Sequence, residues 1–247
     1  MQEISWKDNL RIAWLGSFLT GACISLVVPF MPIFVEQLGV EPSQVTFYSG
    51  LAISVSAISA ACVSPLWGIL ADRYGRKPMM IRAGLAMTIT MGGLAFVPNV
   101  FWLLALRLLN GVFTGFVPNA TALIASQVPK DKSGYALGTL SSGVVAGTLT
   151  GPFVGGMIAE VFGIRNVFLM VGGFLFLAAI LTIFFIKEDF QPVPKEKALP
   201  TKELFTSVKY PYLLFNLFAT SFVIQVAAQS VGPILALYIR DLGQNEN

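Results

Sequence analysis

GILADRYGRKPMMIRAG, residues 68–84, recurs further along the chain as GMIAEVFGIRNVFLMVG, residues 156–172. The two stretches share their glycine spacing, one acidic position and one basic position. The matched pairs are Gly68 with Gly156, Ala71 with Ala159, Asp72 with Glu160, Gly75 with Gly163, Lys77 with Arg165, and Gly84 with Gly172. At the same offset Trp14 and Leu15 align with Trp102 and Leu103. The chain therefore contains an internal repeat.

The composition is that of a helical membrane protein. Of the 247 residues, 55% are hydrophobic and 12% are charged, whereas a soluble domain carries about 25% charged residues. Mean hydropathy is +0.74. Seven apolar runs are long enough to cross a bilayer as helices: 10–35, 46–70, 79–98, 101–125, 136–159, 165–187 and 211–239. Three runs separate the two copies of the repeat, so we expect the copies to cross the membrane in opposite directions.

The basic residues indicate an orientation. Thirteen of the sixteen lysines and arginines, Arg82 among them, are assigned to the N-terminus or to even-numbered loops. By the positive-inside rule, the N-terminus of this multi-pass protein is expected on the cytoplasmic side of the plasma membrane. Charges scattered in this way do not form the basic patch of a nucleic-acid-binding protein.

The residues needed for enzyme chemistry are not grouped in this chain. It has no histidine, and Cys23 and Cys62 lie within apolar runs without metal-ligand spacing. No serine or cysteine nucleophile is accompanied by a base. We therefore predict that the protein is not an enzyme and that it has no cofactor and no metal.

A second, longer repeat relates the first run to the seventh. SFLTGACISLVVPFMPIFVEQLG (17–39) aligns with SFVIQVAAQSVGPILALYIRDLG (221–243). Six runs separate these copies, so both point the same way. The sequence predicts a six-span N-terminal half (1–187), a proline-containing cytoplasmic linker (188–209), and the first span of a truncated second half (210–247). The missing C-terminal half is then an expected partner.

Nested repeats of this kind build the transporters of the major facilitator superfamily, and GILADRYGRKP (68–78) resembles the loop signature of that superfamily at every defined position. The resemblance implies a loop whose contacts break when the two halves separate. Its candidate residues are Gly68, Asp72, Arg73, Gly75, Arg76 and Lys77. The alternative is an ordinary basic loop that only sets topology.

The fourth run contains an arginine, Arg107, which also resembles a signature of proton-coupled members of the superfamily. Arg107, Asn110, Gly111 and Thr114 fall on one helical face, which we expect to line a central cavity. The alternative is that Arg107 extends to the outer membrane surface. Glu36, Asp72 and Glu160 are the candidate proton carriers, although the carrier can also lie in the missing half.

GTLTGPFVGG (147–156) continues a glycine every fourth residue from Gly143. Such a stripe lets another helix approach closely, and we expect its partner in the missing half. A generic packing stripe is the alternative. The pattern resembles the antiporter signature of the drug-efflux families, which implies roles for Gly147, Gly151, Pro152, Gly155 and Gly156.

These observations predict an all-α membrane protein of the major facilitator fold: a six-helix bundle of two inverted three-helix repeats, followed by the first helix of a second half. The resemblance implies a multidrug efflux transporter that exchanges amphipathic drugs for protons across the lipid bilayer by alternating access. Possible cavity residues are Tyr48, Phe113, Phe116, Gln225 and Gln229. The alternatives are a nutrient symporter or uniporter on the same fold, and a complete seven-span receptor or membrane scaffold.

Overall fold

The computed structural model describes residues 5–190 and the short stretches 212–213, 215–224 and 226–227. The chain divides into two units, Met1–Pro192 and Val193–Asn247. In the second unit the described residues are helical and include the apolar helix Phe215–Ile224. Gln225, Gln229 and most of the predicted linker lie outside the described residues.

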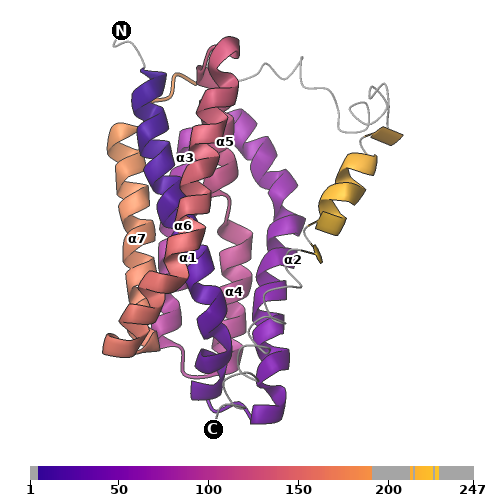
Figure 1. Ribbon diagram of the computed structural model, residues 1–247, viewed down its shortest axis with the longest axis vertical. Helices are drawn as coiled ribbons and strands as arrows, with labels where there is room; N and C mark the ends of the chain where they lie inside the picture. Colours follow the sequence, from indigo (N-terminus) through magenta and orange to yellow (C-terminus); the bar gives the residue numbers. More distant parts are fainter. Residues whose placement is uncertain (1–4, 191–211, 214, 225, 228–247) are drawn as a thin grey trace, which may run out of the picture. The chain divides into compact units, whose positions relative to one another are not determined.

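The described part of the first unit consists of helices joined by short turns, with no strand among its described residues, and successive membrane-spanning segments run in alternating directions (Figure 1). Its elements are α1 (Trp6–Gln37), α2 (Pro42–Tyr74), α3 (Arg76–Gly93), η1 (Leu94–Phe96), α4 (Val100–Phe113), α5 (Phe116–Gln127), η2 (Lys130–Lys132), α6 (Ser133–Phe162) and α7 (Ile164–Phe185). Among the described residues, six segments are long and apolar enough to cross a membrane, with α4 and α5 together forming one of them.

Local capping residues set several helix ends. The Ser5 hydroxyl accepts a hydrogen bond from the Asp8 backbone N–H at the start of α1, and the Asn99 side chain accepts one from Trp102 at the start of α4. Such caps satisfy N–H groups that have no partner within the first helical turn. Proline at the first position of α2 suits a helix start because its ring already holds a helical φ.

The inverted repeat is visible in matching contacts between α3 and α7. Lys77, near the start of α3, donates to the carbonyl of Ile183 at 3.0 Å, and Arg165, near the start of α7, donates to the carbonyl of Ala95 at 2.9 Å. Arg165 follows Lys77 by the same offset that separates Ile183 from Ala95. Each basic side chain therefore binds carbonyls at the far end of the opposing helix, a position where a positive charge is favourable.

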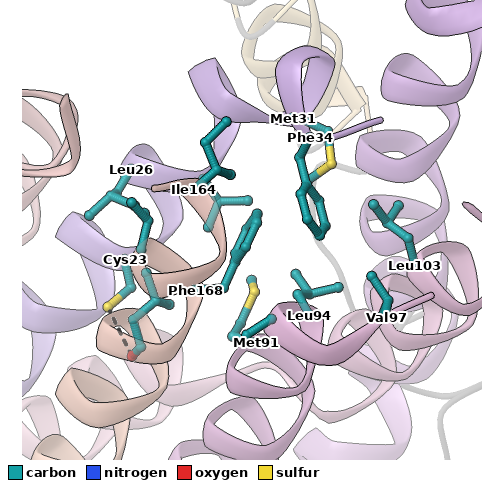
Figure 2. Close-up of a cluster of buried hydrophobic side chains, with 14 of the residues drawn as sticks. Cys23, Leu26, Met31, Phe34, Met91, Leu94, Val97, Leu103, Ile164 and Phe168 are labelled. Atoms are coloured by element: carbon teal, nitrogen blue, oxygen red, sulfur yellow. Dashed lines mark hydrogen bonds between the residues drawn. The ribbon is translucent and has the colours of Figure 1, made fainter. Parts of the chain in front are cut away.

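Two apolar clusters fill the unit. The first joins the second half of α1 to α3, α4 and α7, and its rings Phe34 and Phe168 lie 4.6 Å apart (Figure 2). Cys23 belongs to this cluster and its thiol lies 3.6 Å from the carbonyl oxygen of Val171. The second cluster joins the first half of α1 to α3, α5, α6 and α7 around Phe116.

Two expectations about the spans are wrong. The fourth span is not one helix: α4 ends at Phe113 and α5 begins at Phe116. Arg82, which we assigned to a loop, lies within α3. The two differences are linked by a contact, because Arg82 of α3 binds carbonyls that the interrupted helix leaves free, as described below.

Candidate functional site

The turn between α2 and α3 brings together most of the predicted loop residues. Gly75 ends α2 and precedes α3 with a φ of 100°, in the region that glycine tolerates best. One turn earlier Asp72 accepts a hydrogen bond from the guanidinium of Arg76. The Asp72 side chain is 62% exposed and that of Arg76 is 28% exposed, so their attraction contributes little stability.

Glu188, which follows α7, binds the same turn and was not predicted. Its carboxylate oxygens accept the backbone N–H groups of Arg76 at 2.8 Å and of Lys77 at 2.7 Å. The first N–H groups of a helix have no helical partner and carry positive partial charge, so a carboxylate binds well there. Glu188 therefore fixes the loop from the end of the sixth span. Its place in a charged predicted linker gave no sign of this role.

Arg107 is buried between α2, α3 and α4, with 6% of its surface exposed. Its Nε donates to the carbonyl of Ala52 at 3.2 Å, and its Nη1 lies 3.9 Å from the sulfur of Met91. The side chain therefore does not extend to the membrane surface. Within the described residues no carboxylate forms an ion pair with Arg107.

The other residues of the predicted polar face are only partly like Arg107 in their burial. Asn110 is also buried and donates to the hydroxyl of Thr90 at 3.0 Å. Gly111 lies where α4 meets α2 so closely that an added Cβ would be 2.1 Å from the carbonyl oxygen of Ser56. Thr114 lies beyond the end of α4. Arg107 and Asn110 are therefore packed inside the unit, whereas Gly111 and Thr114 border the hollow described below.

The glycine stripe of α6 packs against α1 of the same unit. A Cβ added at Gly147 would lie 2.1 Å from the carbonyl oxygen of Phe18, and one added at Gly151 would lie 2.4 Å from that of Ala22. The expectation that the partner of the stripe lies in a missing half is therefore wrong. The glycines allow two backbones of one half to touch, which is the usual reason for small residues between membrane helices.

The remaining residues of the predicted antiporter signature differ from one another in their contacts. An added Cβ at Gly155 would lie 2.6 Å from the side chain of Leu26, whereas one at Gly156 would meet nothing within 4 Å. Pro152 lies inside α6 and is partly buried. The contact with α1 therefore involves Gly147, Gly151 and Gly155, which recur at every fourth position, and does not involve Gly156.

The interruption of the fourth span lies at Thr114 and Gly115. Gly115 has a φ of 129°, which no regular helix contains. In a bilayer the carbonyls freed by such a break need donors from the protein itself. Two neighbouring helices, α2 and α3, provide these donors.

Trp67 of α2 and Arg82 of α3 bind the freed carbonyls. The indole N–H of Trp67 donates to Val112 at 2.6 Å, and Nη2 of Arg82 donates to Phe113 at 3.3 Å and to Thr114 at 3.0 Å. The guanidinium carbon of Arg82 lies 3.4 Å from the centroid of the Trp67 ring, a cation–π contact. The only available sign in the sequence was a second arginine inside an apolar run.

A hollow of about 330 Å³ lies between α2 and the interrupted span. Trp67, Arg76, Thr114, Gly115 and Asn119 are among the residues that line it. The indole N–H of Trp67 and the side-chain amide of Asn119 already donate to the carbonyls of Val112 and Gly115, so the hollow alone does not define a binding site.

The predicted cavity aromatics are not brought together. Tyr48 packs against the first apolar cluster and touches Phe47 edge to face. Phe113 lies 6.1 Å from Trp67, near the interruption. Phe116 is 1% exposed and belongs to the second cluster, so its expected place on a cavity wall is wrong. Glu36 is exposed at the end of α1.

Comparison with known proteins agrees with this architecture. Residues 13–245 match the sequence pattern of the Major Facilitator Superfamily. The chain is 84% identical over 247 residues to the multi-drug resistance efflux pump PmrA of Streptococcus pneumoniae serotype 4, covering all of this chain and 62% of that protein. It is 49% identical over 243 residues to the multidrug resistance protein MdtG of Klebsiella pneumoniae, covering 98% of this chain and 59% of that one.

Among solved structures, the fold resembles the human organic anion transporter MFSD10, with a TM-score of 0.66 at 19% identity over 82% of this chain and 53% of that chain. It also resembles the POT family transporter PepTSo, with a TM-score of 0.66 at 15% identity over 77% of this chain and 40% of that chain. At these identities the likeness concerns the fold.

The architecture is that of a multi-pass membrane protein whose six spans form two inverted repeats, the unit from which a class of secondary transporters is built. The chain belongs to the Major Facilitator Superfamily. The predicted all-α membrane fold and family are therefore confirmed. The chain spans about three fifths of the length of the curated relatives it matches.

Proposed function

We propose that this chain is the N-terminal part of a multidrug exporter that exchanges amphipathic drugs for protons by alternating access. The observation that carries this proposal is the 84% identity, over every residue of the chain, to a protein named a multi-drug resistance efflux pump. The full-length transporter would comprise this chain and the remaining five spans of the second half.

The exposed surface of the six-helix unit supports a second half. The most apolar window of α2 has none of its residues buried within the unit, and Leu66 and Ile69 of this helix are 57% and 62% exposed. Apolar surface of this extent contacts either lipid or another membrane domain. In the proposed full-length transporter, α2 is one of the helices that contact the second half.

The proposed orientation places the N-terminus and the α2–α3 turn in the cytoplasm of the cell. Arg73, Arg76 and Lys77 gather at this turn, and Lys130 and Lys132 lie between α5 and α6. The positive-inside rule favours the cytoplasm for such loops. The exposed Asp72–Arg76 pair would then be a contact that forms and breaks at the cytoplasmic entrance.

Arg107 supports proton coupling because its charge is buried and has no anionic partner within the described residues. A buried cation lowers the pKa of any carboxylate that approaches it. The proposed proton carrier is a carboxylate of the second half, on which the positive charge of Arg107 would act without direct contact, so that its proton leaves more readily. Among the described residues, Glu36 and Glu160 are exposed, which makes them poorer candidates for this task.

The test is export by the full-length transporter in lipid vesicles with an imposed pH gradient, using ethidium as the amphipathic cation. We expect ethidium to move against its gradient only when protons flow the other way. Arg107→Ala should abolish this export while the protein still inserts. Arg11→Ala is the matched control because Arg11 is exposed and, within the described residues, forms an ion pair with nearby Asp8 alone. Ethidium movement independent of the pH gradient would contradict proton exchange, and uptake of a nutrient without drug export would contradict the exporter.

A further inference from the structure

The interruption of the fourth span is present in one repeat only. At the offset that matches Gly75 with Gly163, Thr114 and Gly115 align with Leu26 and Val27 of the first span. That span is continuous, since α1 runs from Trp6 to Gln37. The fold of the repeat therefore does not require an interruption at this depth.

The side chains that satisfy the interruption are also present in one repeat only. Trp67 and Arg82 align at the same offset with Gly155 and Met170, and neither of these has a side-chain donor. The unbroken first span needs no such donors. The donors and the interruption therefore occur together.

Arg82 is costly in this position. Its Nε and Nη1 are buried and have no hydrogen-bond partner within the described residues, and unpaired buried donors destabilise a protein. Gly115 adds a backbone conformation that other residues rarely adopt. Features that reduce stability and serve no packing need are concentrated at functional sites.

The two segments on either side of the interruption have different attachments. The α4 segment is bound to α2, where Ser56 donates to the carbonyl of Arg107 at 2.6 Å and Ser59 donates to that of Leu108 at 3.1 Å. The α5 segment is packed against α1, where the Phe116 ring would lie 2.6 Å from a Cβ added at Gly16. A change of angle at the interruption would move α4 with α2 and leave α5 with α1.

We propose that span four bends at Thr114–Gly115 as the transporter changes the side to which it opens, and that Trp67 and Arg82 are the positioning residues for this movement. Between them they bind carbonyls on three successive residues, so they hold the end of α4 in each arrangement while Gly115 supplies the rotation. This inference rests on the proposed transport function.

The direct test is a distance measurement across the interruption in the full-length transporter. Spin labels at Phe101 on α4 and Ala125 on α5, both exposed, report the angle between the segments. Labels at Phe101 and Leu109, both on α4, are the matched control. Cys23 and Cys62 are first replaced by alanine, and export of ethidium by that variant is verified.

We expect the Phe101–Ala125 distance distribution to shift when ethidium is added and the Phe101–Leu109 distribution to stay unchanged. Trp67→Phe keeps a ring beside Arg82 but removes the indole N–H, and Arg82→Lys keeps the charge but loses the planar fork. Each should broaden the Phe101–Ala125 distribution, because the end of α4 loses a donor that holds it, and should lower the maximal export rate about tenfold. The ethidium concentration at half-maximal rate should change little. A merely structural role would lower the amount of folded protein and leave the rate per folded molecule intact.

The outcomes separate this inference from the proposed function. An exporting protein whose Phe101–Ala125 distribution is the same with and without ethidium contradicts the bending. Full export rates in both Trp67→Phe and Arg82→Lys contradict the positioning role. A protein that shows the shift but exports no ethidium contradicts the proposed function and leaves the bending supported.

Discussion

Gly75 and Gly163 have the same backbone conformation at equivalent turns of the two repeats. Their φ and ψ angles are 100° and 162° for Gly75, and 82° and 161° for Gly163. In each turn the glycine N–H donates to the carbonyl four residues earlier, at 2.9 Å for Gly75 and 3.0 Å for Gly163. Their surroundings differ: an added Cβ would lie 2.8 Å from a Glu188 carboxylate oxygen at Gly75 and would meet nothing within 4 Å at Gly163.

Alanine substitutions at Gly75 and Gly163 distinguish the energetic cost of backbone strain from the cost of a close side-chain contact. Gly163→Ala should lower the free energy of unfolding by about 1–2 kcal/mol because an alanine is strained at positive φ. Gly75→Ala carries the same strain and also displaces Glu188, so its loss should be larger. Unfolding of the purified protein in detergent measures both, and equal losses would contradict the contact with Glu188.

The α1–α6 contact predicts a strong effect of one methyl group. Gly147→Ala places a Cβ against the backbone of Phe18, so the helices must separate, at a cost of about 1–3 kcal/mol. Gly138→Ala is the matched control, because it lies on the same helix and its added Cβ meets nothing within 4 Å. Unfolding in detergent should show a lower stability for Gly147→Ala alone. Comparable stability of the two variants would show that the contact tolerates expansion.

Capping by Glu188 predicts local loosening of the α2–α3 turn. Glu188→Ala should speed hydrogen exchange at the backbone amides of Arg76 and Lys77 and lower the stability by about 1 kcal/mol. Glu188→Gln keeps one acceptor oxygen, so its exchange rates and its stability should lie between those of the unchanged protein and those of Glu188→Ala. The control is Asp189→Asn at the exposed neighbouring position. Exchange mass spectrometry measures the effect, and unchanged exchange at both amides would refute the capping.

The Asp72–Arg76 pair predicts a change in transport without a change in stability. Because the Asp72 side chain is 62% exposed, Asp72→Asn should alter the free energy of unfolding by less than about 0.5 kcal/mol. Export of ethidium by the full-length transporter should nevertheless fall if the pair takes part in the opening of the cytoplasmic side. Measuring both quantities on one preparation tests this; a fall in stability that accounts for the loss of export would assign the pair a structural role.

Local properties of the chain predicted much of the fold. The apolar runs correspond to the six spans of the first unit because a bilayer of fixed thickness requires about 20 apolar residues in each helix. Gly75 and Gly163 appear as turns because glycine adopts positive φ without strain. The burial of Arg107 follows from the cost of placing a charge in lipid.

The packing partners were predicted wrongly or not at all. The stripe containing Gly147 and Gly151 shows that some helix comes close, yet nothing along α6 identifies α1 as that helix. Similarly, Glu188 looks like one of several charges after the last span, and only the folded chain brings it to the start of α3.

The sequence alone therefore established the spans, their repeated order and the turns, since these depend on hydrophobicity and backbone freedom within short stretches. The tertiary structure decided which helices touch and where the fourth span breaks. A break inside a membrane exists only where distant donors satisfy the freed carbonyls, and for Val112, Phe113 and Thr114 these donors are Trp67 and Arg82 from two other helices.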